Sequence, residues 1–359
     1  MEKLSFLSQY QERINRLCQD GLLPKYFKAP IFALWELTDR CNLSCIHCYY
    51  NSNPALARLP VRQAGKGGAS RQSENELTTQ EALNVIKQLA GMKVFEVYLT
   101  GGEALLREDW PVLIGELRRN RIQVGLITNG TQIDEHTARK LADLKVKWVQ
   151  LSIDGASADV HDKVRGLAGS WEKSIAAIRY LKQNGIRTHV SFVPTRINFR
   201  DVKKVIALCV EMGLEYFVTD MLVLTGRAAK NFDHIKLGPQ EYLEFYGLLD
   251  EAAKIYADRL TIIAPSREKD ILKTYVKTRS APANIWCIIT PQGACRLDLL
   301  LPFTYGDLRS QSLEYIWNNF LREGWQRPEV AEFINGLNMM PDLIKHKTVP
   351  YVSNHIHCQ

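Results

Sequence analysis

Three of the eight cysteines in this 359-residue chain are grouped as Cys41, Cys45 and Cys48. They follow the apolar segment IFALWELT (31–38), whose composition is typical of a buried β-strand. Thiolates are soft ligands that bind zinc, copper(I) or iron–sulfur clusters. A structural zinc site usually takes four protein ligands, and His47, directly before Cys48, is badly placed to be the fourth. We therefore expect a [4Fe–4S] cluster on three thiolates, with one iron open to another molecule.

Further unusual residues end the next predicted strands. The segments are TGGEAL (100–105), TNGT (128–131) and SIDG (152–155). Each of them alone could be an ordinary strand-end turn. Functional groups of parallel α/β sheets gather at the carboxyl ends of the strands, so these segments and the cysteines should meet at one rim.

The elements that must position these residues alternate regularly. Apolar strand candidates are separated by helical patterns, at roughly 20–30 residues per unit, as expected of βα units in a parallel sheet. The predicted strands are residues 31–38, 94–100, 122–128, 148–153, 188–194 and 216–222. These six strands are too few for a closed eight-stranded barrel. The sequence therefore predicts an α/β fold, a partial (β/α)6 TIM-type barrel with a small C-terminal α+β extension.

The expected regions are an N-terminal helical segment at 1–30, the barrel at 31–230 and the extension at 231–359. Residues 51–76 are rich in Gly, Ser, Asn and Pro, which predicts a long loop. The helix after this loop should begin with a capping box of Thr78 and Glu81. In the extension, PQG (291–293) predicts the turn of a β-hairpin, and a helix follows.

The bulk composition favours a cytoplasmic protein without nucleic-acid or membrane partners. The formal net charge is +7, but the basic residues are dispersed rather than collected in a run. No apolar stretch has the length of a membrane span, and the N-terminus lacks the basic start and apolar centre of a signal peptide. Cytoplasmic thiols stay reduced, so clustered cysteines there indicate metal binding or reactivity rather than disulfides.

The Cys41-x-x-x-Cys45-x-x-Cys48 motif, followed by GGE, TNG and SIDG, resembles the radical S-adenosylmethionine (SAM) enzymes over roughly residues 31–230. The resemblance implies a (β/α)6 partial barrel and a cluster whose fourth iron chelates the amino and carboxylate groups of SAM. It also implies one-electron cleavage of SAM to methionine and a 5′-deoxyadenosyl radical that abstracts a hydrogen atom. An electron donor such as flavodoxin or ferredoxin is then an expected partner.

The resemblance also assigns SAM-binding roles to residues of this chain. Gly101, Gly102 and Glu103 match the motif that receives the methionine amino group, and a carboxylate suits an ammonium. Ser152 is similar to residues that contact ribose or carboxylate, and Arg165 to the arginine that pairs with the SAM carboxylate. Arg165 could instead be a solvated surface residue. The other expected cofactor-binding residues are Asn129 of TNG, and His47 and Tyr49, which would pack near adenine.

Residues 290–319 resemble the C-terminal extension called SPASM, or its shorter form twitch, through PQG, Cys295 and YGDLRSQSLEYIW. Such extensions usually bind auxiliary [4Fe–4S] clusters through many cysteines, but of eight cysteines the triad leaves only five. We expect at most one auxiliary cluster, bound by Cys287, Cys295 and Cys358, although the first two could simply pack in the hairpin. A lone cysteine such as Cys358 could also be catalytic, as a hydrogen-atom donor.

Enzymes with such an extension mostly modify ribosomally made peptides or build haem- and quinone-type cofactors. Our main hypothesis is a radical SAM enzyme that epimerises or cross-links a ribosomal peptide. One alternative acts on a small cofactor precursor, and another is a non-catalytic zinc-binding scaffold. Cross-linking is a net oxidation and needs an exit for electrons. Epimerisation is redox-neutral for the peptide and needs a thiol donor, so the sequence leaves this choice open.

Overall fold

The computed structural model describes residues 13–14, 16–49, 52, 75–223, 225–264, 284–299 and 301–336, together with the backbone of 356–358. Most of the predicted N-terminal helix and most of the predicted loop at 51–76 lie outside these residues. Within the described residues, none of the helices is both long enough and apolar enough to cross a membrane.

One continuous sheet organises the described chain, with its strands in the order β11-β10-β9-β8-β1-β2-β3-β4-β5-β6-β7. The first strands along the chain are β1 (Phe32–Thr38), β2 (Glu96–Gly101), β3 (Gln123–Thr128), β4 (Trp148–Ser152), β5 (Arg187–Phe192) and β6 (Tyr216–Thr219). Each pairs in parallel with the next, which confirms the predicted strands. A further parallel strand, β7 (Thr261–Ile263), is not predicted from the sequence because it is too short to show a periodic pattern.

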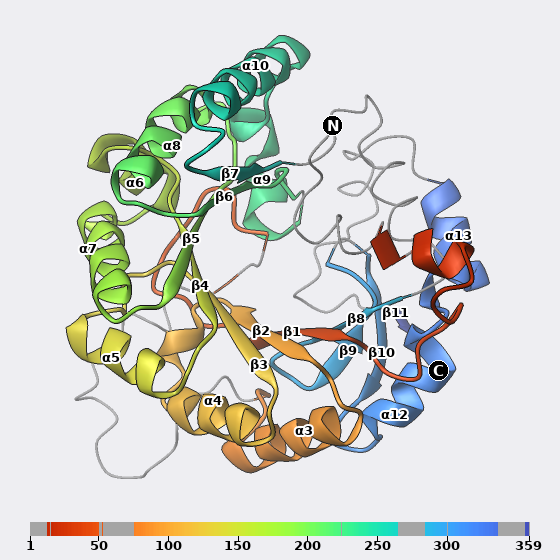
Figure 1. Cartoon of the computed structure of the whole chain (residues 1–359). Coiled ribbons are helices and arrows are strands. Elements are labelled where there is room, and N and C mark those ends of the chain that lie inside the picture. Colours follow the sequence, from red (N-terminus) through yellow and green to blue (C-terminus); the bar gives the residue numbers. More distant parts are fainter. Residues whose placement is uncertain are drawn as a thin grey trace.

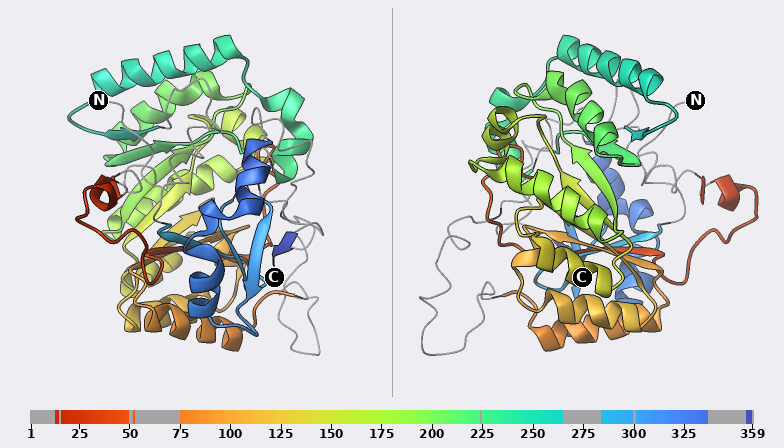
Figure 2. Two further views of the ribbon diagram at one scale, coloured as in Figure 1. Left: turned by 90° about the vertical axis from the view of Figure 1, so that its right-hand side faces the viewer. Right: turned by 60° about the vertical axis from the view of Figure 1, so that its left-hand side comes forward.

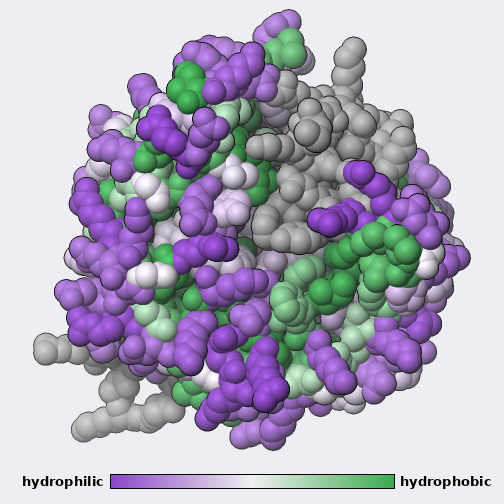
Figure 3. Space-filling view, in the orientation of Figure 1, coloured by the Kyte–Doolittle hydropathy of each residue, from purple (hydrophilic) through white to green (hydrophobic). Residues whose placement is uncertain are grey.

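Helices cover the outer face of this sheet, as expected of a partial TIM-type barrel (Figure 1). They are α3 (Thr79–Gly91), α4 (Trp110–Arg119), α5 (Glu135–Asp143), α6 (Ala158–Arg165), α7 (Ser170–Gln183), α8 (Val202–Glu211) and α10 (Pro239–Ile255). Helix α9 (Gly226–Ile235) lies inside this ring of helices, against the loop that follows β1. The predicted capping box is confirmed, since Glu81 N–H donates to Thr78 Oγ1 at 3.2 Å and Thr78 N–H donates to Glu81 Oε2 at 2.8 Å. Hydrophilic side chains predominate over α4 to α7 on the face shown in Figure 3.

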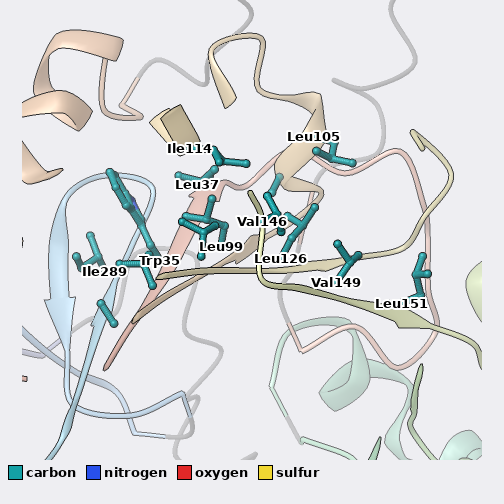
Figure 4. Packing of buried hydrophobic residues seen from close by; sticks show 14 of the residues in the cluster. Trp35, Leu37, Leu99, Leu105, Ile114, Leu126, Val146, Val149, Leu151 and Ile289 are labelled. Atoms are coloured by element: carbon teal, nitrogen blue, oxygen red, sulfur yellow. The ribbon is translucent and has the colours of Figure 1, made fainter. Parts of the chain in front are cut away.

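Alternate side chains of each strand face either the helices or the inside of the barrel. On β1, Ala33, Trp35 and Leu37 belong to the large core that also contains the buried faces of the helices. Figure 4 shows Trp35 and Leu37 close to Leu99 of β2 and Leu126 of β3, which belong to the same core. The other face of these strands therefore lines the barrel interior.

The inner face is aromatic where β1 begins and polar where it ends. The aromatic members of this second buried cluster are Phe32, Tyr98, Trp148 and Trp286. Gly125 of β3 makes room for them, because a Cβ atom there would lie 2.1 Å from the Trp148 ring. Farther along β1, the inner face presents Glu36 and Thr38, both fully buried. The polar end is the rim at which the candidate site residues were expected.

The C-terminal extension continues the barrel sheet. β8 (Trp286–Ile289) pairs in parallel with β1, and β9 (Ala294–Arg296) returns antiparallel to β8, which confirms the predicted hairpin. The sheet ends with β10 (Phe303–Asp307) and β11 (Ile356–Cys358). Helices α12 (Leu313–Ile316) and α13 (Pro328–Asn335) lie at this side of the molecule (Figure 2). The predicted boundary near residue 230 stays a prediction, but the sheet itself is shared by both sides of it.

Candidate functional site

The predicted cluster ligands lie together in the loop that leaves β1. Cys41 and Cys45 are buried, Cys48 is half-buried, and all three belong to one contact cluster with Leu43 and Leu167. Burial, followed by the neighbouring Cys45 thiol, raises the pKa of Cys41 above its ordinary value. As thiolates, these groups need positive partners, which the irons of a cluster would provide.

The spacing of these thiols bears on the kind of metal site. Within the residues that the structure describes, no three His, Cys, Asp or Glu side chains converge closely enough for a single metal ion. The thiolates of a three-cysteine [4Fe–4S] site bind separate irons, so they do not need to converge on one point. The cysteine loop is therefore compatible with the expected cluster.

Gly101 and Gly102 hold the end of β2 against the start of the cysteine loop. Gly102 N–H donates to Thr38 O at 2.7 Å, and Glu103 N–H donates to Arg40 O at 2.8 Å. Gly101 has a φ of +124°, and a Cβ atom on Gly102 would lie 2.2 Å from Arg40 O. The close approach that requires glycine here is to the chain's own backbone, and contact with SAM stays a prediction.

Glu103 is fully buried, and its carboxylate holds the end of β3. It accepts hydrogen bonds from Thr128 Oγ1 at 2.8 Å and from the N–H groups of Asn129 and Leu105 at 2.9 and 3.2 Å. Burial raises the pKa of Glu103, and these hydrogen bonds oppose the rise. Since both carboxylate oxygens have internal donors, the expected pairing with the methionine amino group would compete with those donors.

Asn129 packs beside the first cysteine. Its Nδ2 lies 3.9 Å from Cys41 Sγ and donates to Asn42 Oδ1 at 3.0 Å. Asn129 Oδ1 accepts from Thr131 Oγ1 at 2.6 Å, and Asn129 O accepts from Ser174 Oγ at 2.8 Å. The TNG segment thus contacts the cysteine loop, and its contact with SAM stays a prediction.

Arg165, at the end of α6, is buried, so the surface alternative is wrong. Its Nη1 lies 3.6 Å from Cys45 Sγ, and its Nη2 lies 2.7 Å from Asp154 Oδ2. His47 Nε2 lies 3.3 Å from the same Asp154 oxygen. Asp154 was not among the predicted site residues, although an aspartate that follows a buried strand is a usable signal. This one fully buried carboxylate links two of the expected cofactor-binding residues.

The charges of Asp154 and Arg165 balance each other, and His47 beside them is neutral. Burial would raise the pKa of Asp154, but the Arg165 guanidinium brings it below its ordinary value. Burial lowers the pKa of His47 to about 4 despite Asp154, so the imidazole is neutral near pH 7. Burial would lower the pKa of Arg165, but Asp154 and the Cys45 thiol raise it. Among the described residues, Arg165 Nε and His47 Nδ1 are buried and have no hydrogen-bond partner.

Ser152 and Tyr49 lie toward the barrel interior. Ser152 Oγ is half-buried, 3.5 Å from Ser191 Oγ on the neighbouring strand. Burial, followed by the nearby Glu36 carboxylate, raises the pKa of the Tyr49 phenol, which also interacts with the Thr100 hydroxyl. Their expected contacts with ribose and adenine stay predictions.

Helix α9 holds the second half of the cysteine loop. Arg227 Nη1 donates to Cys45 O at 3.0 Å, and its Nη2 donates to Ser52 O at 2.9 Å. Two more bonds to the loop backbone run from Ala228 N–H to Cys48 O at 3.0 Å and from Asn231 Nδ2 to Ile46 O at 2.9 Å. This helix was not among the predicted elements, because it lacks a long apolar stripe.

We expect Arg227→Ala to reduce retention of the reconstituted cluster several-fold. Each hydrogen bond from its guanidinium contributes about 1.5–3 kcal/mol. The two bonds hold the backbone at Cys45 and at Ser52, on either side of Cys48. Iron and sulfide per chain, and the rate at which cluster absorbance is lost in air, measure the effect. Arg139→Ala removes an exposed pair on α5 and is the matched control. Equal retention in the two variants would show that α9 does not stabilise the loop.

Glu76 holds the start of the cysteine loop, and it was missed because it ends a polar segment. Its Oε1 accepts hydrogen bonds from Thr38 Oγ1 at 2.7 Å and from Asp39 N–H at 2.8 Å. Burial, followed by the adjoining Asp39 carboxyl group, raises the pKa of Glu76 to about 7. The folded protein therefore binds this proton more tightly than the unfolded chain does.

The contribution of Glu76 to stability should be full below about pH 4.5 and be lost as the pH rises through about 7. Glutamine does not ionise, so Glu76→Gln should raise the free energy of unfolding at about pH 8 by on the order of 1–3 kcal/mol. Near pH 4.5 the variant and the wild type should be alike. Thermal unfolding at both pH values, with the exposed Glu135→Gln as control, measures this. A difference that does not change with pH would contradict it.

Cys287 and Cys295 face the helices rather than the barrel interior. Both are fully buried in the large core, and Cys287, followed by burial, raises the pKa of the adjoining Cys295 thiol. The Cα register places Cys358 opposite Tyr305, whose partner on the other side is Cys295. These surroundings support the packing alternative for the two buried thiols. The auxiliary cluster and the hydrogen-donor role of Cys358 stay predictions.

Comparison with known proteins identifies the class. Residues 35–209 match the family profile of the Radical SAM superfamily. The fold is similar to that of SuiB from Streptococcus suis, with a TM-score of 0.65 and 14% identity over 98% of this chain and 82% of that one. Residues 35–209 therefore form a radical SAM domain, and the cofactors of that family are a [4Fe–4S] cluster and SAM.

Two curated relatives differ in their described activities. The AdoMet-dependent heme synthase of Methanosarcina barkeri is 28% identical over 309 residues, which cover 81% of this chain and 83% of the relative. The mycofactocin maturase MftC of Mycolicibacterium smegmatis is 32% identical over 222 residues, which cover 62% of this chain and 52% of the relative. The aligned segment thus spans about half the length of the maturase.

Proposed function

We propose that this radical SAM enzyme binds its cluster through Cys41, Cys45 and Cys48 and modifies a ribosomally made peptide. The observation that carries the cofactor assignment is the contact between these three buried or half-buried thiols beside the Arg165 guanidinium. When bound, the cluster and SAM together supply one-electron reduction and the hydrogen abstraction that follows. The family match supports this chemistry.

The chain's own residues would orient SAM and limit access of water. The carboxylate of SAM fits the Arg165 guanidinium, whose Nε has no partner among the described residues. Asp154 would keep that guanidinium in place, because its carboxylate is 2.7 Å from Nη2. His47, neutral and buried, can offer Nδ1 to the same molecule. Asp154, His47 and Arg165 are themselves buried, which would limit access of water to their side of the cysteine loop.

The relation to a mycofactocin maturase supports a peptide substrate. The choice between the two peptide modifications follows from the spare cysteines. With Cys287 and Cys295 packed in the core, two of the three expected ligands of an electron-accepting auxiliary cluster face away from the barrel interior. This favours epimerisation, which is redox-neutral for the peptide, over cross-linking.

A second candidate function is modification of a haem-type precursor. The heme synthase relative favours it, because the similarity extends over most of both chains. One experiment separates the two candidates. The reconstituted enzyme is incubated with SAM and reductant in deuterated water, with either a peptide encoded beside its gene or a porphyrin precursor.

The peptide function predicts that only the peptide changes, with deuterium incorporation at one α-carbon for epimerisation or loss of a hydrogen pair for cross-linking. Mass spectrometry of the peptide distinguishes these products. Modification of the porphyrin alone would replace the peptide function by the second candidate. Formation of 5′-deoxyadenosine in the absence of both compounds is the background control.

A further inference from the structure

Three nitrogen donors face the sulfur atoms of two expected cluster ligands. Cys41 Sγ accepts a hydrogen bond from the backbone N–H of Leu43 at 3.5 Å and a longer one from Asn129 Nδ2 at 3.9 Å. Cys45 Sγ lies 3.6 Å from Arg165 Nη1. Leu43 donates from its backbone, and Arg165 is half of a buried ion pair. Asn129 is therefore the donor whose removal disturbs the fewest other contacts.

The orientation of the Asn129 amide is fixed by hydrogen bonds that do not involve a cysteine. Its Oδ1 accepts from the backbone N–H of Thr131 at 2.9 Å and from the Thr131 hydroxyl at 2.6 Å. A backbone N–H can only donate, so the oxygen atom must lie on that side and Nδ2 must face Cys41. Nδ2 also donates to Asn42 Oδ1 at 3.0 Å. The amide thus directs the positive end of its dipole toward the sulfur atom.

A closed ring of side-chain hydrogen bonds holds this amide in place. Asn42 Nδ2 donates to Thr131 Oγ1 at 2.7 Å, and the Thr131 hydroxyl donates in turn to Asn129 Oδ1. The bond from Asn129 Nδ2 to Asn42 Oδ1 completes the ring. Asn129 is 7% exposed and Cys41 is 8% exposed, so solvent screens the interaction between amide and sulfur only weakly. The ring joins the loop after β3 to the residue that directly follows the first cysteine.

We propose that Asn129 raises the reduction potential of the cluster through the Nδ2–H group that faces Cys41. The inference rests on the proposed cluster site, and it gives this residue of the TNG segment a role other than contact with SAM. One electron from an external reductant adds negative charge to the cluster and its cysteine sulfurs. A hydrogen-bond donor at a sulfur stabilises the reduced form more than the oxidised form, and such bonds are among the features that set the potential. An oriented amide dipole acts in the same direction.

Asn129 is in this sense a positioning residue that acts through Cys41. Reductive cleavage of SAM requires the reduced cluster, so the donor affects the fraction of enzyme that a given reductant can prepare for the reaction. The contact joins two strand-end loops, because Asn129 follows Cys41 by 88 residues.

A redox titration of the reconstituted enzyme without SAM tests this proposal. The electron paramagnetic resonance signal of the reduced cluster is recorded against the applied potential, for protein that carries about four irons per chain. Asn129→Leu removes the donor and keeps the shape of the side chain. The equilibrium constant for one-electron reduction should fall at least about threefold in this variant, which corresponds to a decrease of roughly 30 mV. Asn129→Asp places a charged oxygen atom where Nδ2 was and should lower the constant further.

Thr131→Val is the matched control within the same ring. It removes the hydroxyl, but the backbone N–H of residue 131 still bonds to Asn129 Oδ1, so Nδ2 stays directed at Cys41. Its reduction potential should match that of the wild type. If Asn129→Leu does not retain its cluster, Asn129→Asp decides alone, because it keeps the acceptor oxygen for Thr131.

An unchanged potential in the Asn129 variants that retain the cluster would overturn the proposal. An equal decrease in Thr131→Val would overturn it as well, because the effect would then come from the ring rather than from the donor at the sulfur. Failure of the cluster assignment is read separately. Wild-type protein that retains no iron and sulfide after reconstitution would overturn that assignment, and this inference with it.

Discussion

Replacement of Cys41, Cys45 and Cys48 together by alanine should abolish reductive cleavage of SAM. The three thiols form one contact cluster, so their loss removes the proposed electron source and the proposed SAM anchor together. We expect 5′-deoxyadenosine formation to fall to the background of the assay. Cys209→Ala is a matched control, because that thiol is buried on α8 away from the site.

The same triple variant tests the auxiliary cluster when its iron and sulfide are measured after anaerobic reconstitution. Since Cys287 and Cys295 pack in the helix-facing core, we expect iron near zero. About four irons per chain would indicate an auxiliary cluster after all. Undiminished 5′-deoxyadenosine formation by the variant would show that the cluster assignment itself is wrong.

Asp154→Ala should destabilise the fold by about 3–5 kcal/mol, because it leaves the buried Arg165 guanidinium without its carboxylate. The pKa of Asp154 is lowered in the folded state, so the stability that it contributes is present above its ordinary pKa and is lost only at lower pH. The loss should therefore be nearly constant between about pH 5 and 8. Denaturant unfolding of the apoprotein across this range measures it.

A double variant separates stability from SAM binding. Asp154→Leu/Arg165→Met replaces the buried pair by apolar side chains, which should restore most of the stability. SAM affinity should stay low by about tenfold or more, because the proposed carboxylate partner is gone. Titration of SAM against the cluster's spectroscopic signal tests this, with Arg139→Met as control. Wild-type affinity in the double variant would mean that Arg165 has only a structural role.

Several interpretations of single residues changed once the tertiary contacts were known. The glycines of GGE were expected only from their match to a SAM-binding motif, which stays a prediction, and the structure adds that they pack closely against the backbone of Thr38 and Arg40. Arg165 was open to interpretation as a surface residue, yet it lies beside Cys45, which precedes it by 120 residues. Contacts over such separations leave no local pattern, because neither partner's neighbours in sequence reveal the other.

The sequence by itself determined the chemistry and the architecture. The cysteine spacing is local, since one short loop carries all three expected ligands, and the strand and helix periodicities are local as well. They were sufficient to predict the partial barrel, the capping box at Thr78 and the hairpin of the extension.

Only the tertiary structure decided which side chains and strands support the cysteine loop. Three contacts join segments that are distant in sequence. Asp154 contacts His47, Arg227 bonds to the cysteine loop, and β8 pairs with β1. Arg227 and Cys45 are 182 residues apart. The faces of Cys287 and Cys295 also depend on which strand pairs with which, because the register of a sheet sets the side on which every side chain lies.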